Sequence, residues 1–131
     1  YQQLAIIKEL VKRKYSDIKI VSVPIIRESD GLAMSTRNNY LSVKERAGAP
    51  LFHQALRAAL EDLESGKDVV LTAKRAFTTL SESFVVDYVE ILDANTLKEI
   101  TPKSKEIIII SAVRLGATRL IDNIVFRRVN V

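Results

Sequence analysis

The chain has 131 residues, enough for one domain with a hydrophobic core, and its 47% hydrophobic and 27% charged residues are typical of a globular protein. It contains no Cys and a single His, His53. Disulfide scaffolds, thiol nucleophiles, Cys-ligated metals and mechanisms that need two imidazoles within this chain are therefore excluded. The net charge of +4 favours anionic ligands but is too small to argue for nucleic acid.

We expect neither a membrane-spanning segment nor a secretory leader. Its longest apolar run, Ile107–Ile110, is far shorter than the ~20 residues that a membrane-spanning helix needs. With the lack of Cys, this predicts a cytoplasmic protein with no membrane partner. Since the chain begins at Tyr1, inside an expected helix, we expect it to be part of a longer polypeptide.

The first elements predict the end of an α/β domain. Residues 1–15 carry apolar side chains at helical spacing, and the β-branched run Ile18–Val23 predicts a strand that Pro24 ends. A helix followed by such a strand is the repeating unit of a parallel α/β sheet. We therefore expect residues 1–25 to be the last helix–strand unit of a Rossmann-like nucleotide-binding domain.

Two helices are expected after a long polar connection over residues 24–41. The capping box Ser42-x-x-Glu45 predicts a helix that runs to about Glu64, with Pro50 interrupting its first turns. The apolar face of this helix consists of Phe52, Ala55, Leu56, Ala59, Leu60 and Leu63, with Leu51 at its edge. A second helix over residues 69–81 carries one apolar side made of Val70, Ala73, Ala76, Phe77 and Leu80.

Three strands then follow, because the hydrophobic period changes to two. They are expected over residues 85–92, 107–113 and 118–128, with Gly116 in the last connection. Residues 26–131 are therefore predicted to form an α+β domain, in which helices pack on a small, mainly antiparallel three-stranded sheet.

The loop Ser35-Thr36-Arg37-Asn38 contains the residue types that bind phosphate. Two hydroxyls can donate to phosphate oxygens, and a guanidinium can hold them with two parallel bonds. The loop also follows a parallel-type strand, and α/β proteins bind ligands at the carboxyl ends of such strands. The residue types alone still favour an ordinary solvated turn.

Structural roles are favoured for most of the other candidate residues. Arg27, Glu28 and Asp30 are expected to pair across the turn rather than contact a ligand, and His53 is expected to be a packed residue rather than a base. Arg114 and Arg119 are favoured as strand-end charges, and Met34 as a core residue. For Gln2 and Gln3 both interpretations stay open: they could contact a polar ligand at the start of a helix, or simply be solvated.

The stretch Arg27–Leu41, RESDGLAMSTRNNYL, closely resembles the signature of the pantoate–β-alanine ligase family. The resemblance covers nearly the whole chain and continues through Tyr1–Leu4, Asp87–Glu90 and Arg114–Asn123. It reverses the interpretation of the Ser-Thr-Arg-Asn loop as a solvated turn.

The resemblance implies a two-step condensation that consumes ATP with magnesium. Pantoate attacks the α-phosphorus to give pantoyl adenylate and pyrophosphate, and the amine of β-alanine then displaces AMP to form pantothenate. It further implies small-molecule partners only, with no nucleic acid, prosthetic group or protein-bound metal. The full-length family member is expected to be a homodimer, joined mostly through a part that this chain lacks.

The resemblance also implies residue roles. Ser35, Thr36 and Arg37 would hold the ATP phosphates and act in catalysis, with Met34 in the same ATP-binding loop. The backbone around Val23–Ile26 (Val23 and Ile26 in particular) would lie along the adenine, and Gln3 would bind pantoate. Thr36 stands where the family usually has Ser. The hydroxyl is retained, and the added methyl group narrows the loop.

The family's first signature, a His-x-Gly-His loop, has no match in the sequence. We therefore expect a C-terminal portion, in which residues 26–131 form the lid domain, that binds ATP weakly and does not turn over alone. One alternative is a non-catalytic, lid-like binding module. Nucleic-acid binding is disfavoured, because only 6% of the residues are aromatic and no basic stripe accompanies them.

Overall fold

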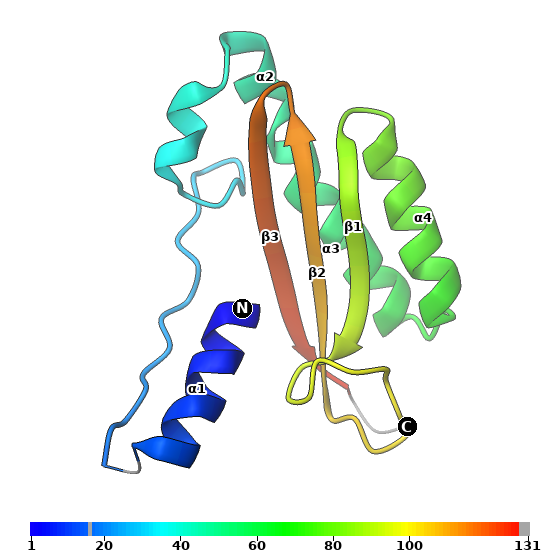
Figure 1. Ribbon diagram of the computed structural model, residues 1–131. Helices are drawn as coiled ribbons and strands as arrows, with labels where there is room; N and C mark the ends of the chain where they lie inside the picture. The colour runs from blue at the N-terminus through cyan, green and yellow to red at the C-terminus, as the bar shows by residue number, and fades with distance from the viewer. Residues whose placement is uncertain (16, 129–131) are drawn as a thin grey trace.

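The computed structural model describes residues 1–15 and 17–128. Three strands form one antiparallel sheet in the order β1-β2-β3, and helices α3 and α4 pack against it (Figure 1). The elements in chain order are α1 (Gln2–Lys14), the 3₁₀-helix η1 (Thr36–Tyr40), α2 (Val43–Gly48), α3 (Pro50–Glu64), α4 (Val69–Ser81), β1 (Val85–Asp93), β2 (Glu106–Leu115) and β3 (Thr118–Arg127). The predicted α+β architecture is confirmed.

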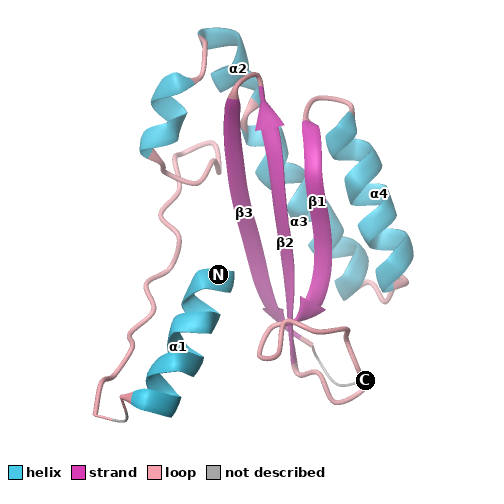
Figure 2. Ribbon diagram, viewed as in Figure 1, coloured by secondary structure: helices cyan, strands magenta, loops and turns pink. Residues whose placement is uncertain are grey.

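The core lies between the sheet and the two long helices (Figure 2). The central strand β2 is buried along most of its length, and Ile107, Ile109 and Val113 are among its residues in this core. From α3, Phe52 and Leu56 are at most 1% exposed. The sequence predicted this face of α3 because its apolar residues recur at helical spacing.

Pro50 separates α2 from α3. The first helix ends at Gly48 and the second begins at Pro50. Proline is tolerated in the first turn of a helix, because the N–H that it lacks would have no partner within the helix there. The predicted capping box is present, since Ser42 Oγ accepts from Glu45 N at 3.3 Å and Glu45 Oε2 accepts from Ser42 N at 2.8 Å. The long predicted helix is therefore two helices.

The inward face of α4 differs from the prediction in three positions, Val70, Thr72 and Phe77. Thr72, Ala76 and Leu80 are buried, whereas Val70 and Phe77 are 59% and 45% exposed. The sheet and α3 cover only a narrow side of this helix, so apolar residues at its flanks remain in contact with solvent.

The predicted strand Ile18–Val23 does not form. These residues run as an exposed, extended segment, and Val21 and Val23 are 73% and 79% exposed. β-Branched residues favour a strand only where a neighbouring strand supplies hydrogen bonds, and none pairs with this segment among the described residues. The expected domain boundary at residues 25 and 26 stays a prediction.

Helix α1 contributes no buried residue and contacts the rest of the molecule mainly at its start. The hydroxyl of Tyr1 donates to Ala94 O at 2.9 Å, just after β1. The hydroxyl of Tyr88 on β1 donates to Gln2 Oε1 at 3.4 Å. Figure 1 shows α1 on the side of the sheet away from α4.

Candidate functional site

The residues before the Ser-Thr-Arg loop form a small hairpin. Arg27 and Ala33 make an antiparallel bridge, and Met34 N donates to Ile26 O at 2.9 Å. A turn at Asp30-Gly31 closes this hairpin, with Gly31 at φ +90°, a conformation that suits glycine. Leu32 is 3% exposed and lies in the main core. The start of the loop is therefore attached to the folded domain.

Arg27 joins this hairpin to strand β3. Its Nη1 lies 2.7 Å from Asp122 Oδ2, and its Nη2 lies 3.0 Å from Asp122 Oδ1. The expected pairing of Arg27 with Glu28 and Asp30 across the turn is wrong. Asp30 instead binds Arg46 of α2 at 2.6 Å, and this guanidinium holds the pKa of the Asp30 carboxyl below its usual value.

The phosphate-binding candidates lie at the start of η1. Ser35 caps this 3₁₀-helix, because its Oγ accepts from Arg37 N at 3.2 Å. The side-chain amide of Asn38 donates to Ala33 O at 3.0 Å and so links η1 to the hairpin, while Asn38 Oδ1 is buried without a partner. Local hydrogen bonds therefore order the loop in the absence of ligand.

The side chains of this loop point to solvent. Ser35, Thr36 and Arg37 are all exposed. Within the described part of the chain, no hydrogen bond or ion pair engages the Arg37 guanidinium, so its donors are open to a ligand. Met34 is 56% exposed, and its interpretation as a core residue is wrong. Two hydroxyls and a guanidinium on an ordered loop can bind anionic oxygens.

Arg114 and Arg119 both bind Asp87 on the sheet. Asp87 Oδ2 accepts from Arg119 Nε at 2.7 Å, and Oδ1 accepts from Arg114 Nε at 3.2 Å. These two guanidinium groups lower the pKa of the Asp87 carboxyl, and the hydrogen bond from Arg119 contributes most. The structural interpretation of both arginines as strand-end charges therefore agrees with their contacts.

Of the other predicted site residues, Ile26 lies next to the loop, because its carbonyl accepts from Met34 N at 2.9 Å, whereas Gln3 lies on a separate element, helix α1. Gln3 is exposed on α1, and Val23 and Ile26 are exposed in the extended segment. Figure 1 shows α1 and η1 at opposite ends of that segment. A groove of about 680 Å³ lies between α1 and the turn Ala94–Leu97, but none of the predicted site residues lines it.

Sequence reasoning missed the buried carboxylate of Asp122, whose side chain is 2% exposed. A signal for it exists, because strand alternation places residue 122 on the same face as Leu120 and Ile124, which both pack in the core. A buried carboxylate needs a partner. Arg27 lies 95 positions away, so no local pattern could identify it.

His53 lies beside the same carboxylate, with Nδ1 3.1 Å from Asp122 Oδ2. Burial and the positive charge of Arg27 lower the pKa of His53, and Asp122 opposes this effect. The imidazole is half-buried, in keeping with the packed residue expected from the sequence.

The described residues hold neither a cluster of metal-ligating side chains nor a helix able to span a membrane. No group of three or more His, Asp or Glu side chains is placed to hold a metal ion in residues 1–15 and 17–128. Over the same residues, no helix combines the length and the apolar character needed to cross a membrane.

Comparisons with known proteins identify the family. The family model described as pantoate-beta-alanine ligase matches residues 1–125. A pantothenate synthetase from Ruthia magnifica is 47% identical over 128 residues, which are 98% of this chain and 46% of that protein. One from Neisseria meningitidis serogroup C is 47% identical over 126 residues, covering 95% of this chain and 45% of the relative.

The fold comparison agrees with the sequence comparison. A crystal structure of pantothenate synthetase from Thermus thermophilus superimposes with a TM-score of 0.86 at 35% identity, over 95% of this chain and 46% of that one. The chain spans about half the length of the curated relatives it matches. On these matches, the chain belongs to the pantoate-beta-alanine ligase family.

Proposed function

We propose that this chain carries the phosphate-binding loop of an ATP-dependent pantoate–β-alanine ligase, and that it corresponds to the C-terminal portion of such an enzyme. The observation that carries the proposal is the ordered loop Ser35–Arg37, in which the Arg37 guanidinium has no partner among residues 1–15 and 17–128. Membership of the family supports the choice of substrates.

The proposed reaction needs no nucleophile from this chain. The pantoate carboxylate attacks the α-phosphorus of ATP, a new P–O bond forms, and pyrophosphate leaves. The β-alanine amine then attacks the acyl carbon, the bond to AMP breaks, and the amine loses a proton. Such steps are accelerated by placing the reactants and by stabilising the charge on phosphate oxygens.

Each predicted residue has a role in that scheme. The hydroxyls of Ser35 and Thr36 donate to phosphate oxygens, and Arg37 offsets their charge with two parallel N–H bonds. Gln3 holds pantoate, and the backbone near Val23 and Ile26 lies along the adenine. The exposed, extended segment before Arg27 allows the loop to approach a ligand held at α1, and closure would exclude water from the adenylate.

The site is proposed to need residues outside this chain. None of the predicted site residues lines the groove between α1 and the turn Ala94–Leu97, and the relatives are about twice as long. We therefore expect weak binding of Mg-ATP and no turnover by this chain alone. A cytoplasmic location and a homodimer joined through the remaining part stay predictions.

Titration calorimetry of Mg-ATP into this chain tests the proposal. We expect Arg37→Ala to weaken binding at least tenfold, equivalent to about 1.4 kcal/mol. Arg75→Ala is the matched control, because it removes an exposed arginine of α4 that takes no part in the loop. Equal affinities for the native chain and Arg37→Ala would show that the loop is not a phosphate clamp.

Binding by neither protein would mean that the site forms only with residues outside this chain. Pantoate-dependent release of AMP by this chain alone, at a rate comparable to an intact enzyme, would contradict the expected lack of turnover.

A non-catalytic binding module is the second candidate. It is favoured by one observation, that α1, the helix that carries Gln3, and η1 lie at opposite ends of the extended segment (Figure 1). This candidate predicts phosphate affinity without AMP release, even when the remaining half of a family member is supplied as a separate chain.

A further inference from the structure

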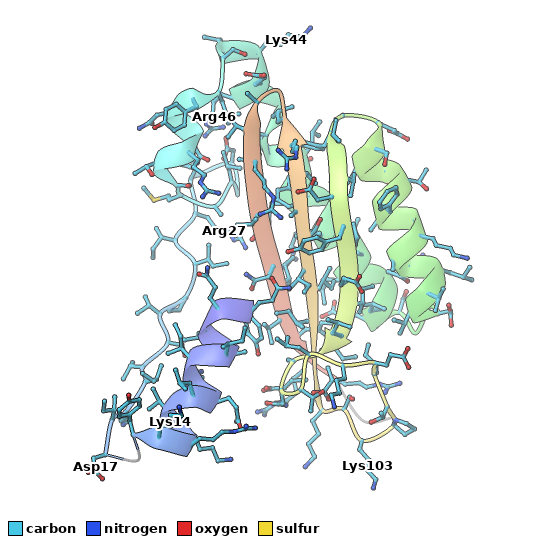
Figure 3. All side chains as sticks on the ribbon, viewed as in Figure 1. Lys14, Asp17, Arg27, Lys44, Arg46 and Lys103 are labelled. Carbon is cyan, nitrogen blue, oxygen red and sulfur yellow. The ribbon has the colours of Figure 1, made fainter. Side chains whose placement is uncertain are left out.

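We propose that Arg27 and Asp122 are positioning residues for the phosphate-binding loop. Their ion pair holds the hairpin before Ser35 at one place on strand β3, and so sets where the hydroxyls and guanidinium of the loop lie. Figure 3 shows Arg27 beside β3, at the junction between hairpin and sheet. The inference rests on the proposed function, since placement matters only if the loop binds phosphate.

The guanidinium of Arg27 forms hydrogen bonds both to strand β3 and to the hairpin. On the sheet, it donates to both carboxylate oxygens of Asp122, at 2.7 and 3.0 Å, and to Asn123 O at 3.4 Å. On the hairpin, its Nη1 also donates to Gly31 O at 3.1 Å. One planar group with fixed donor directions therefore sets the distance and the angle between turn and strand.

Asp122 cannot turn away from this contact without losing several bonds. Its side chain is 2% exposed, its Oδ1 accepts from Asn123 N at 2.7 Å, and its Oδ2 lies 3.1 Å from His53 Nδ1. A carboxylate buried to this extent requires a compensating positive charge, which Arg27 supplies. The carboxylate is therefore a fixed point on which the hairpin is oriented.

The other attachments of the hairpin do not provide the same orientation. Leu32 packs in the core, but hydrophobic contact is non-directional. Asp30 pairs with Arg46 of α2, but both side chains are more than one-third exposed, and exposed ion pairs contribute little. The directional contact that joins the hairpin to the sheet before Ser35 is that of Arg27.

A rigid path leads from Arg27 to the phosphate-binding side chains. Arg27 bridges Ala33 across the hairpin, and Ala33 O accepts from the Asn38 side chain of η1 at 3.0 Å. Ser35 lies two residues after Ala33. If Arg27 loses its fixed place, the loop samples several positions, and phosphate binding then has to order it.

Hydrogen exchange and calorimetry on the full 131-residue chain test this role. Arg27→Gln removes the charge, and Arg27→Lys keeps the charge but removes the planar fork. The matched control is Arg75→Gln, which breaks another Arg–Asp pair, 2.9 Å long, between α4 and α3. Amides of Glu28, Gly31, Met34 and Asn38 report on the hairpin and η1, because each donates a backbone hydrogen bond there.

We expect Arg27→Gln to raise exchange at these four amides at least tenfold relative to amides of β2, and to weaken Mg-ATP binding at least fivefold. Arg27→Lys should give an intermediate effect on both. Arg75→Gln should change neither. Unchanged exchange and affinity in Arg27→Gln would overturn the proposal, and so would raised exchange with unchanged affinity, which marks a purely structural ion pair.

Two further outcomes are informative. If Arg27→Gln does not fold, Arg27→Lys and Asp122→Asn give the same comparison with less loss of charge or shape. If the native chain binds no Mg-ATP, the proposal that the loop binds phosphate fails for this chain alone. The hydrogen-exchange measurement then decides whether the ion pair positions the loop. An increase in hydrogen exchange confined to residues 28–41 then supports the positioning role of the Arg27–Asp122 ion pair, and an increase spread over the whole chain overturns it.

Discussion

His53 shares the Asp122 carboxylate with Arg27, and this arrangement decides its charge. Burial and Arg27 both disfavour the imidazolium, and the attraction of Asp122 only partly offsets them, so the pKa lies below the ordinary value of 6.5. Arg57 acts in the same direction as Arg27. The folded chain therefore holds a neutral imidazole at neutral pH.

We predict that acid destabilises the chain through His53. Between its ordinary pKa of 6.5 and its lower folded value, the unfolded state binds more protons, so the free energy of unfolding falls as the pH drops through this window. One proton contributes a slope of at most about 1.4 kcal/mol per pH unit. Free energies of unfolding, measured with urea at several pH values across this range, should depend less steeply on pH for His53→Gln than for the native chain. Parallel curves for the two proteins would contradict the prediction.

At the scale of single residues, the ion-pair partners of charged side chains were the feature least predictable from the sequence. Sequence proximity suggested that Arg27 pairs with Glu28 or Asp30, but an exposed pair contributes little stability. The buried carboxylate of Asp122 needs the cation far more, and it comes close only when β3 is in place. The hydroxyls and guanidinium of Ser35–Arg37 could be recognised from the sequence because they are contiguous.

At the scale of elements, short-range sequence patterns predicted the helices and strands that short-range interactions determine. The capping box and the helical period identified α4 and the helical region that Pro50 divides into α2 and α3, and the change to a period of two identified the three strands. The strand predicted over Ile18–Val23 was wrong because a strand depends on a neighbour that a propensity does not reveal.

Gly116 couples α2 to the β2–β3 hairpin, which leads to a second prediction. It lies at φ +58°, and an added Cβ would overlap the Glu45 carboxylate, which also caps α2 through Ser42 N. Gly66 lies at φ +82° with nothing within 4 Å of an added Cβ. Alanine at either position incurs backbone strain of roughly 1 kcal/mol.

We therefore expect Gly116→Ala to destabilise the chain by about 0.5–2 kcal/mol more than Gly66→Ala, because it also displaces the cap. Urea unfolding measures the difference. In a Glu45→Ala background, the excess should disappear. Equal losses for the two glycines in the native background would show that Glu45 does not couple α2 to the hairpin.

At the scale of the whole molecule, stability is concentrated in the two-layer unit. Buried residues of the main core come from Leu32 onwards, and the largest of the fully buried side chains lie on α3, α4 and β2. Helix α1 buries none, and Ile6 and Val21 are 66% and 73% exposed. Apolar burial is the main favourable contribution to folding, so residues 1–25 contribute little of it.

This distribution predicts that a chain of residues 26–131 folds by itself. The bonds that it loses to the N-terminal segment include Tyr1–Ala94 at 2.9 Å and Tyr88–Gln2 at 3.4 Å, each worth about 1 kcal/mol. Urea unfolding should give one cooperative transition, with a loss of no more than about 2 kcal/mol. Tyr1→Phe in the full chain isolates the first bond. An unfolded 26–131 chain would place α1 within the folding unit and contradict a domain boundary near residue 25.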